Sequence, residues 1–337
     1  MAAYIARRLL LALLSVWVIS VLSYAIIQLP EGDMVTAKIN GLMQSGVAVN
    51  MELADNLRAY YGIDQPLFVR YTKWAWNMLR HGDLGISHHY YCSAAPVERS
   101  VKEVIGDRIQ LTVALTGFTI LVTWSFAIPV GIYSAVRQHS VGDYVFTLLG
   151  FTGVAVPDFL LGLVLMYVAF AFFDQSVGGL FSADYLDAPW GWGKAYDLLK
   201  HLWIPAVVLG TSGTAGLIRV MRNNLLDELA RPYVITARAK GVAAWKVIIK
   251  YPVRVAINPL ISTIGYLLPS LISGSVIVSV VLSLPTLGPV LLDSIVQQDE
   301  FTAGFIVLVL GILTVLGTLI SDILLVIVDP RIKFTGR

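Results

Sequence analysis

The sequence predicts an all-α membrane protein with six transmembrane helices and an extracytoplasmic helical insertion after the first helix. The first observation behind this prediction is composition: of 337 residues, 57% are hydrophobic and only 14% are charged, with a mean hydropathy of +0.74. Soluble domains carry about 25% charged residues, so this chain has more apolar surface than a soluble fold can bury. The second observation is that six long apolar segments recur, each near the ~20 residues that a helix needs to cross the hydrocarbon core.

The same composition argues against other classes of protein. One cysteine cannot form an intramolecular disulfide framework, and five scattered histidines do not suggest a zinc or haem cluster. A net charge of +2 gives no indication of nucleic-acid binding. We therefore expect no metal site and no nucleic-acid partner.

The six segments are almost free of charge, as membrane spans must be because backbone polar groups in lipid have to pair within the segment. Only Asp158 interrupts the third segment and only Asp322 the sixth. The first segment is too long for a cleavable signal peptide and lacks a small-residue cleavage pattern after it. The predicted spans are residues 9–29, 109–136, 144–173, 202–218, 255–284 and 301–328.

The spans divide the chain into four parts, and the Lys and Arg residues between the spans indicate its orientation in the membrane. With both termini inside, the cytoplasmic segments hold 14 of the 24 Lys and Arg residues but only four acidic residues, as the positive-inside rule requires. We therefore expect a multi-pass membrane protein with both termini in the cytoplasm. The parts are an N-terminal transmembrane helix (1–29), an extracytoplasmic insertion (30–108), a core of five transmembrane helices (109–329) with a cytoplasmic loop at 219–254, and a cytoplasmic tail (330–337).

The insertion is expected to hold two short helices, at 51–61 and 66–80, which end at Gly62 and Gly82. The second helix is rich in aromatic side chains. Packing of a small subdomain against the helix ends is favoured for them, and the alternative is contact with the membrane interface or with an entrance. These aromatic residues are Phe68, Tyr71, Trp74 and Trp76.

Two smaller clusters lie in the outer loops. Trp190 and Trp192 are typical of anchors at the membrane interface, with stacking on a sugar or a peptide side chain as the alternative. His88 and His89 near Cys92 would allow a metal site, but solvated loop histidines are the favoured interpretation.

The cytoplasmic loop before the fifth span is the most informative. Pro232 suits the first turn of a helix and Gly241 suits a C-terminal cap, which predicts helices at 233–240 and 243–250. Ala237 and Gly241 are four residues apart and would share one face. A small-residue face flanked by cations suits docking into another protein, whereas the alternative is a basic helix that rests on anionic lipid.

The order of residues in this loop distinguishes the two interpretations. The run Tyr233-Val-Ile-Thr-Ala-Arg-Ala-Lys-Gly241 closely resembles the coupling-loop motif of ABC-importer permeases in the dipeptide/oligopeptide branch. The resemblance covers nearly the whole chain. Its other motifs, in order, are Tyr4-Ile-Ala-Arg-Arg-Leu, Glu31-Gly-Asp33, Tyr61-Gly-Ile-Asp-Gln-Pro-Leu, Gly82-Asp-Leu-Gly-Ile-Ser87, Pro96-Val, Pro157-Asp-Phe159, Ser273-Gly-Ser-Val-Ile-Val278, Pro285-Thr-Leu-Gly288, Asp322 and Asp329-Pro-Arg-Ile332.

This resemblance implies the type I ABC-importer permease fold and a pore-forming subunit of an ATP-driven, binding-protein-dependent importer. Implied partners are a second homologous permease, an external solute-binding protein and two cytoplasmic ATPase subunits that bind ATP and Mg; this chain itself would hold no cofactor. A heterodimeric pore is favoured, and a homodimer stays open. The implied solute is a dipeptide or an oligopeptide, with a nickel chelate, an oligosaccharide or another small solute as the alternative.

The resemblance also implies roles for residues of the coupling loop. Thr236, Ala237 and Gly241 would sit in a groove of the ATPase. Arg238 and Lys240 would contact its rim. The full set is Tyr233, Thr236, Ala237, Arg238, Lys240 and Gly241. Three positions depart from the family pattern: Ser279 replaces a usual Glu, Thr286 a usual Gly, and Ile235 an acidic residue. The first two bear on the external gate and the solute rather than on the fold.

The remaining candidates lie in or beside the spans. A carboxylate in mid-span usually faces a watery path or the protein interior, so Asp158 is a candidate for the translocation pathway; its alternative role is to cap a helix broken at Pro157. Small hydroxyl residues near the fifth span are further candidates, with helix packing as the default. These are Ser273, Ser275 and Ser279, and structural roles are expected for Asp322, Asp329 and Arg331.

An intramembrane enzyme is the alternative class of protein. The sequence contains neither His-Glu-x-x-His nor Gly-x-Ser-x-Gly, and no histidine lies in the apolar core of a predicted span. It also lacks the Gly-x-x-x-x-Gly-Lys-Ser/Thr loop that binds ATP. A receptor or scaffold would not need the small-faced basic loop. We therefore expect a transport subunit that is not itself an enzyme.

Overall fold

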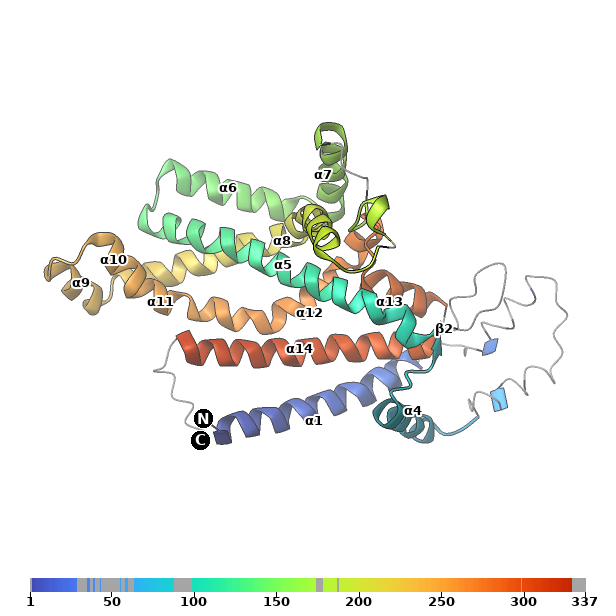
Figure 1. Cartoon of the computed structure of the whole chain (residues 1–337). Helices are drawn as coiled ribbons and strands as arrows, with labels where there is room; N and C mark the ends of the chain where they lie inside the picture. The colour runs from blue at the N-terminus through green and yellow to red at the C-terminus, as the bar shows by residue number, and fades with distance from the viewer. Residues whose placement is uncertain are drawn as a thin grey trace. The chain divides into compact units, whose positions relative to one another are not determined.

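A computed structural model describes residues 2–28, 35–36, 39, 43, 55, 58–59, 64–87, 99–173, 178–186, 188–297 and 299–328. Within these residues the structure is helical, apart from turns and a two-residue antiparallel ladder between β1 (Ile86–Ser87) and β2 (Arg99–Ser100). Five helices are long and apolar enough to cross a membrane, and the number is six when a bent pair is counted as one span. The prediction of an all-α protein with six spans is confirmed (Figure 1).

The described residues group into two compact units, which we call the core unit and the insertion unit. The core unit draws on Met1–Ile5, Thr112–Pro285 and Thr314–Arg337, and the insertion unit on Ala6–Leu111 and Thr286–Leu313. Thr286–Leu313, which includes the beginning of the last span, thus belongs to the same unit as the insertion, although the two are far apart in sequence.

Helix α8 is the centre of the core unit and packs against α6, α7, α11 and α12. Gly131 of α5 permits close approach to α8, because a Cβ there would lie 2.7 Å from the Cβ of Met221. The core-unit elements are α5 from Thr112 onward (the whole helix is Val101–Val136), α6 (Val141–Ala155), α7 (Asp158–Phe173), the single 3₁₀ turn η1 (Ala183–Tyr185), α8 (Trp192–Leu229), α9 (Pro232–Ala239), α10 (Ala244–Lys250), α11 (Pro252–Ala256), α12 (Asn258–Val281) and the second half of α14 (Glu300–Val328).

The third predicted span, 144–173, is not one straight helix. It consists of α6 and α7, which are bent by 105° at a short break. Pro157 lies in this break, where its ring disfavours helical geometry for the preceding residue and it has no N–H to donate. Asp158 is therefore in the first turn of α7 rather than in the middle of a straight span. The fourth predicted span, 202–218, is also longer than expected, since polar residues on both sides of the apolar segment continue α8.

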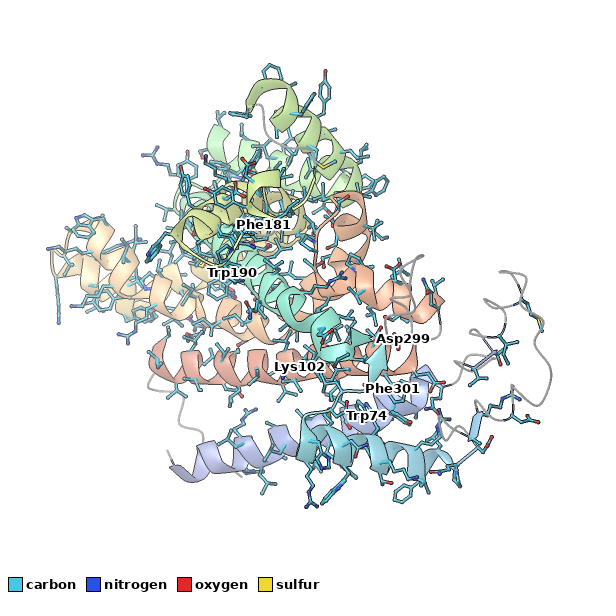
Figure 2. All side chains as sticks on the ribbon, turned by 45° about the vertical axis from the view of Figure 1, so that its right-hand side comes forward. Trp74, Lys102, Phe181, Trp190, Asp299 and Phe301 are labelled. Carbon is cyan, nitrogen blue, oxygen red and sulfur yellow. The ribbon has the colours of Figure 1, made fainter. Side chains whose placement is uncertain are left out.

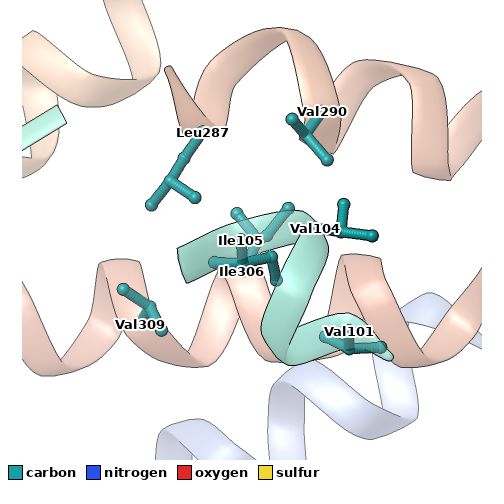
Figure 3. Packing of buried hydrophobic residues seen from close by; sticks show 7 residues of the cluster. All are labelled: Val101, Val104, Ile105, Leu287, Val290, Ile306 and Val309. Carbon is teal, nitrogen blue, oxygen red and sulfur yellow. The ribbon is translucent and has the colours of Figure 1, made fainter. Parts of the chain in front are cut away.

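The insertion unit contains α1 from Ala6 onward (the whole helix is Ala2–Ile27), α4 (Leu67–His81), the start of α5, α13 (Leu287–Val296) and the first half of α14. Figure 3 shows the first turns of α5 between α13 and α14, where apolar side chains of all three helices meet. The buried members of this cluster are Val101, Val104, Ile105, Leu287, Val290, Ile306 and Val309.

Helix α4 confirms the predicted second helix of the insertion. Gly82 ends it in the left-handed conformation, with φ +63°. Trp74 is buried with Tyr24 of α1, the two ring centroids being 5.4 Å apart, and Tyr71 shares a 2.8 Å hydrogen bond with Ser20 (Trp74 is labelled in Figure 2). The packing interpretation therefore holds for Tyr71 and Trp74. Phe68 and Trp76 are exposed, and the first predicted helix, 51–61, falls largely outside the described residues.

Asp299 joins the β ladder to the beginning of α14. Its carboxylate is buried and accepts hydrogen bonds from Ser87 Oγ at 2.7 Å, Thr302 Oγ1 at 2.7 Å and the Thr302 N–H at 3.2 Å. The bond from the Thr302 N–H caps the helix. Next to it, Glu300 pairs with Arg70 of α4 at 2.9 Å and accepts from Gln28 at 3.1 Å. Polar contacts thus fix α1, α4 and β1 to one end of α14.

We expect Asp299→Ala to destabilise the insertion unit, because it removes a helix cap and leaves the Ser87 hydroxyl buried without this acceptor. The expected loss is about 2–4 kcal/mol, seen as a lower thermal midpoint of the purified full-length chain. Asp64→Ala is the control, since Asp64 is exposed in the same unit. Equal midpoints for the two variants would contradict the role of Asp299.

Candidate functional site

The cytoplasmic loop predicted from sequence forms a hairpin of two short helices, α9 and α10. Both expected helices, 233–240 and 243–250, are confirmed within one or two residues. Pro232 is the first residue of α9. Figure 1 shows the hairpin at one end of the core unit, beyond the bundle formed by α6, α8 and α12. We call this pair of helices the coupling hairpin.

The turn between the two helices depends on Gly241, which has φ +76°. Its N–H donates to the carbonyl of Arg238 at 2.9 Å, and the N–H of Val242 donates to the carbonyl of Ala237 at 3.4 Å. This pair of bonds is a Schellman cap, which needs a residue in the left-handed region. Glycine adopts that conformation without steric strain, so the sequence signal for the helix end was correct.

The coupling hairpin has a small core of its own. Val234, Ala237 and Val247 are buried, with Val242 and Tyr251 packed around them. Ala237 is therefore turned toward α10 rather than outward. Gly241 by contrast is exposed at the turn. The two small residues thus differ in exposure, although their spacing suggested one common face.

The outer surface of the hairpin combines cations with apolar side chains. Thr236, Arg238 and Lys240 are exposed on α9, and Tyr233 is 39% exposed while its hydroxyl donates to the carboxylate of Glu228 on α8. Large apolar side chains lie exposed beside them. These are Ile235, Trp245 and Ile249. An exposed apolar patch with cations around it is typical of a protein contact surface.

The candidate pathway residues are spread over two helices. Asp158 is half-buried at the start of α7, and the helix break suggested as its alternative context is present. Ser275 and Ser279 of α12 are buried within this chain. The side chain of Ser273 lies outside what the structure describes. No contact in the described residues assigns these side chains to a pathway, so that role stays a prediction.

Two contacts fix the end of α14 in the core unit. Ser321 Oγ donates to the carbonyl of Ile261 at 2.8 Å, and Arg254 Nε donates to the carbonyl of Val328 at 2.8 Å. Asp322 is half-buried beside the first contact. The contact of Arg254 could not be predicted from residue types, because its acceptor is a backbone carbonyl. Asp329 and Arg331, for which structural roles are expected, lie outside the described residues.

The segment before α8, which was predicted to be an outer loop, holds an aromatic cluster. The rings of Phe181 and Trp190 meet edge to face at 6.1 Å (Figure 2), and Lys194 Nζ lies 5.0 Å and 5.5 Å from their centroids. Lys194 also donates to the carbonyl of Ala188 at 2.7 Å. Trp192 is 94% exposed. The two tryptophans thus differ: one belongs to a packed cluster and the other is open to the surroundings.

The predicted histidine and cysteine cluster is not described by the structure. His88, His89 and Cys92 lie outside the described residues. Among the residues that are described, no group of three or more His, Cys, Asp or Glu side chains is arranged to hold a metal ion.

Comparisons with known proteins agree with this geometry. A family model described as "binding-protein-dependent transport system inner membrane component" matches residues 127–334. The oligopeptide transport system permease protein AppB of Bacillus subtilis is 35% identical over 335 residues, which cover 99% of this chain and all of the relative. A putative peptide permease of Brucella ovis is 32% identical over 99% of this chain and all of its own length. The dipeptide transport system permease protein DppB of Escherichia coli K12 is 30% identical over 99% of both chains.

We expect Gly241→Ala to weaken the coupling hairpin by about 1 kcal/mol, since an alanine in the left-handed region is strained. Amide hydrogen exchange of Val242 should become about fivefold faster. Gly213→Ala is the matched control: a Cβ would meet no heavy atom within 4 Å at either position, but only Gly241 has positive φ. Unchanged exchange in Gly241→Ala would contradict the cap.

Proposed function

The chain belongs to the binding-protein-dependent transport system inner membrane components, which are the pore-forming permease subunits of ABC importers, and we propose that it imports dipeptides or oligopeptides. It forms the pore together with a second, homologous permease subunit. A solute-binding protein delivers the peptide from outside, and two cytoplasmic ATPase subunits bind ATP and Mg. Both termini and the coupling hairpin lie on the cytoplasmic side.

The coupling hairpin is the observation that supports this function. It keeps its own buried core, so it can be moved as one body, and its exposed cations and apolar side chains suit contact with a partner. The chain itself has no phosphate-binding loop of the Gly-x-x-x-x-Gly-Lys-Ser/Thr type. Energy from ATP must therefore reach the pore through a contact with another subunit.

The proposed cycle follows from this contact. ATP binding brings the two ATPase subunits together, and the two hairpins docked on them move with them. Because Tyr233 of the hairpin is bonded to Glu228 of α8, that movement is passed to the helix at the centre of the core unit. The pore opens outward to receive the peptide, and hydrolysis returns it to the inward-open state.

Peptide as the solute is supported by the relatives, whose names refer to oligopeptide and dipeptide transport. We propose that Asp158 contacts the peptide in the pathway, where a carboxylate suits a peptide's amino terminus. Ser273, Ser275 and Ser279 are further pathway candidates, whereas Asp322, Asp329 and Arg331 are assigned structural roles. An oligosaccharide importer of the same architecture is the second candidate.

Charge reversal on the coupling hairpin tests this function. Arg238→Glu should reduce ATP hydrolysis and uptake of a labelled dipeptide by about tenfold in proteoliposomes that hold the whole complex and its binding protein, since it replaces a cation of the proposed contact by a carboxylate and so removes its charge complementarity. Arg137→Glu is the control, because Arg137 is an equally exposed cation on the α5–α6 turn outside the hairpin.

Two results would contradict the proposal: one concerns the ATPase contact and the other concerns the solute. Unchanged hydrolysis and uptake in Arg238→Glu would exclude this surface as the ATPase contact. Uptake of a labelled oligosaccharide but not of the dipeptide by the unmodified complex would exclude the peptide and leave the importer intact.

The orientation can be tested with single cysteines, because Cys92 is the only native one. In a Cys92→Ser background, Thr236→Cys should react with a membrane-impermeant maleimide only in inside-out vesicles. Trp192→Cys, at the exposed first residue of α8, should react only in right-side-out vesicles. Labelling of Thr236→Cys from the outer side would contradict the cytoplasmic hairpin.

A further inference from the structure

A groove between α6 and the second half of α8 is separate from both the coupling hairpin and the pathway candidates. It has a volume of about 470 Å³ and lies entirely within the core unit. One end is polar, with His139 of the α5–α6 turn and Asn223 of α8. The other end reaches Gly150 and Phe151, two helical turns further along α6.

The groove carries more positive than negative charge. Asp143 is its one acidic lining residue, and that carboxylate is buried in a pair with Arg222 at 3.1 Å while it also accepts the N–H of His139 at 3.0 Å. Arg219 is exposed and has no acidic side chain within ion-pair distance among the residues that the structure describes. Its guanidinium lies 5.3 Å from the ring centroid of Phe151 instead. Arg219 therefore leaves a cation available to an anionic ligand.

The rest of the groove is apolar and belongs to a helix with an apolar exterior. Phe146, Phe151 and Ile218 form its walls. Along the same helix α6, four large aliphatic side chains beyond its first turn are between 46% and 65% exposed. These are Val145, Leu148, Leu149 and Val154. An amphiphile with a negative head and a hydrocarbon tail matches this distribution of charge and apolar surface.

We propose that this groove binds an anionic phospholipid of the cytoplasmic leaflet. The lipid phosphate lies at Arg219, within reach of the polar end at His139 and Asn223, and an acyl chain lies against Phe151 and Ile218. Basic pockets between transmembrane helices on the cytoplasmic side are suited to such headgroups. The assignment to that leaflet rests on the proposed orientation, because the groove is at the same end of α8 as the coupling hairpin.

Lipid binding is tested on the purified full-length chain by native mass spectrometry and by thermal melting with added phosphatidylglycerol, phosphatidylcholine or inorganic phosphate. Phosphatidylglycerol should bind and raise the melting temperature, whereas the other two should not. Arg219→Gln should weaken phosphatidylglycerol binding about fivefold, the effect expected for one cation at an anionic headgroup. Arg219→Lys should retain most of the binding.

Arg137→Gln is the matched control, since it removes an exposed cation close to the groove that does not line it. Equal losses of phosphatidylglycerol binding in Arg137→Gln and Arg219→Gln would show that the lipid responds only to the overall surface charge, and this would overturn the site. Equal binding of phosphatidylcholine would overturn the anionic specificity. An equal rise in melting temperature with inorganic phosphate would show a site for anions in general and overturn its specificity for lipid. Loss of phosphatidylglycerol binding when a second permease subunit is added would assign the groove to a protein contact. None of these measurements requires transport, so they stand apart from the test of the importer.

Discussion

The coupling hairpin packs mainly within itself and against the adjoining α11, and this constraint governs how its sequence is used. Val234, Ala237 and Val247 fill the space between its two helices. A helix of eight residues is too short to be stable by itself in water, so α9 depends on this packing and on the cap at Gly241. The side chains that remain outside are then available to a partner. A loop without such a core would bend under load rather than transmit a movement to the pore.

The local parts of this arrangement were predictable from sequence and the non-local parts were not. Pro232, Gly241 and Gly82 mark helix ends through their own backbone preferences, and the structure has those ends. The inward direction of Ala237 was not evident, because it depends on where α10 folds back. A helix break at Pro157 was one of the two interpretations of Asp158, but the 105° angle between α6 and α7 was not evident, since hydropathy reports burial in lipid and not the direction of a helix.

Long-range polar contacts were the least predictable features. Asp299 reads in sequence as an ordinary loop acid, yet it is buried where it caps α14 and receives the hydroxyl of Ser87 from more than 200 residues away. Arg254 and Arg222 each count as cytoplasmic cations in a charge balance. In the structure Arg254 donates to a carbonyl at the end of α14, and Arg222 pairs with the buried carboxylate of Asp143. A charge balance therefore assigned their side of the membrane without showing their partners.

Helix α8 connects the groove to the coupling hairpin. Its second half carries the groove residues Arg219 and Arg222 and then Glu228, which accepts the hydroxyl of Tyr233 from the hairpin. The helix contains one proline, Pro205, in its first half, where a missing N–H and the proline ring weaken the hydrogen bonding of the turn before it. No proline follows between there and Leu229. A displacement of the hairpin should therefore move the groove-bearing half of α8 as a rigid segment, and bending, where it occurs, should be concentrated near Pro205.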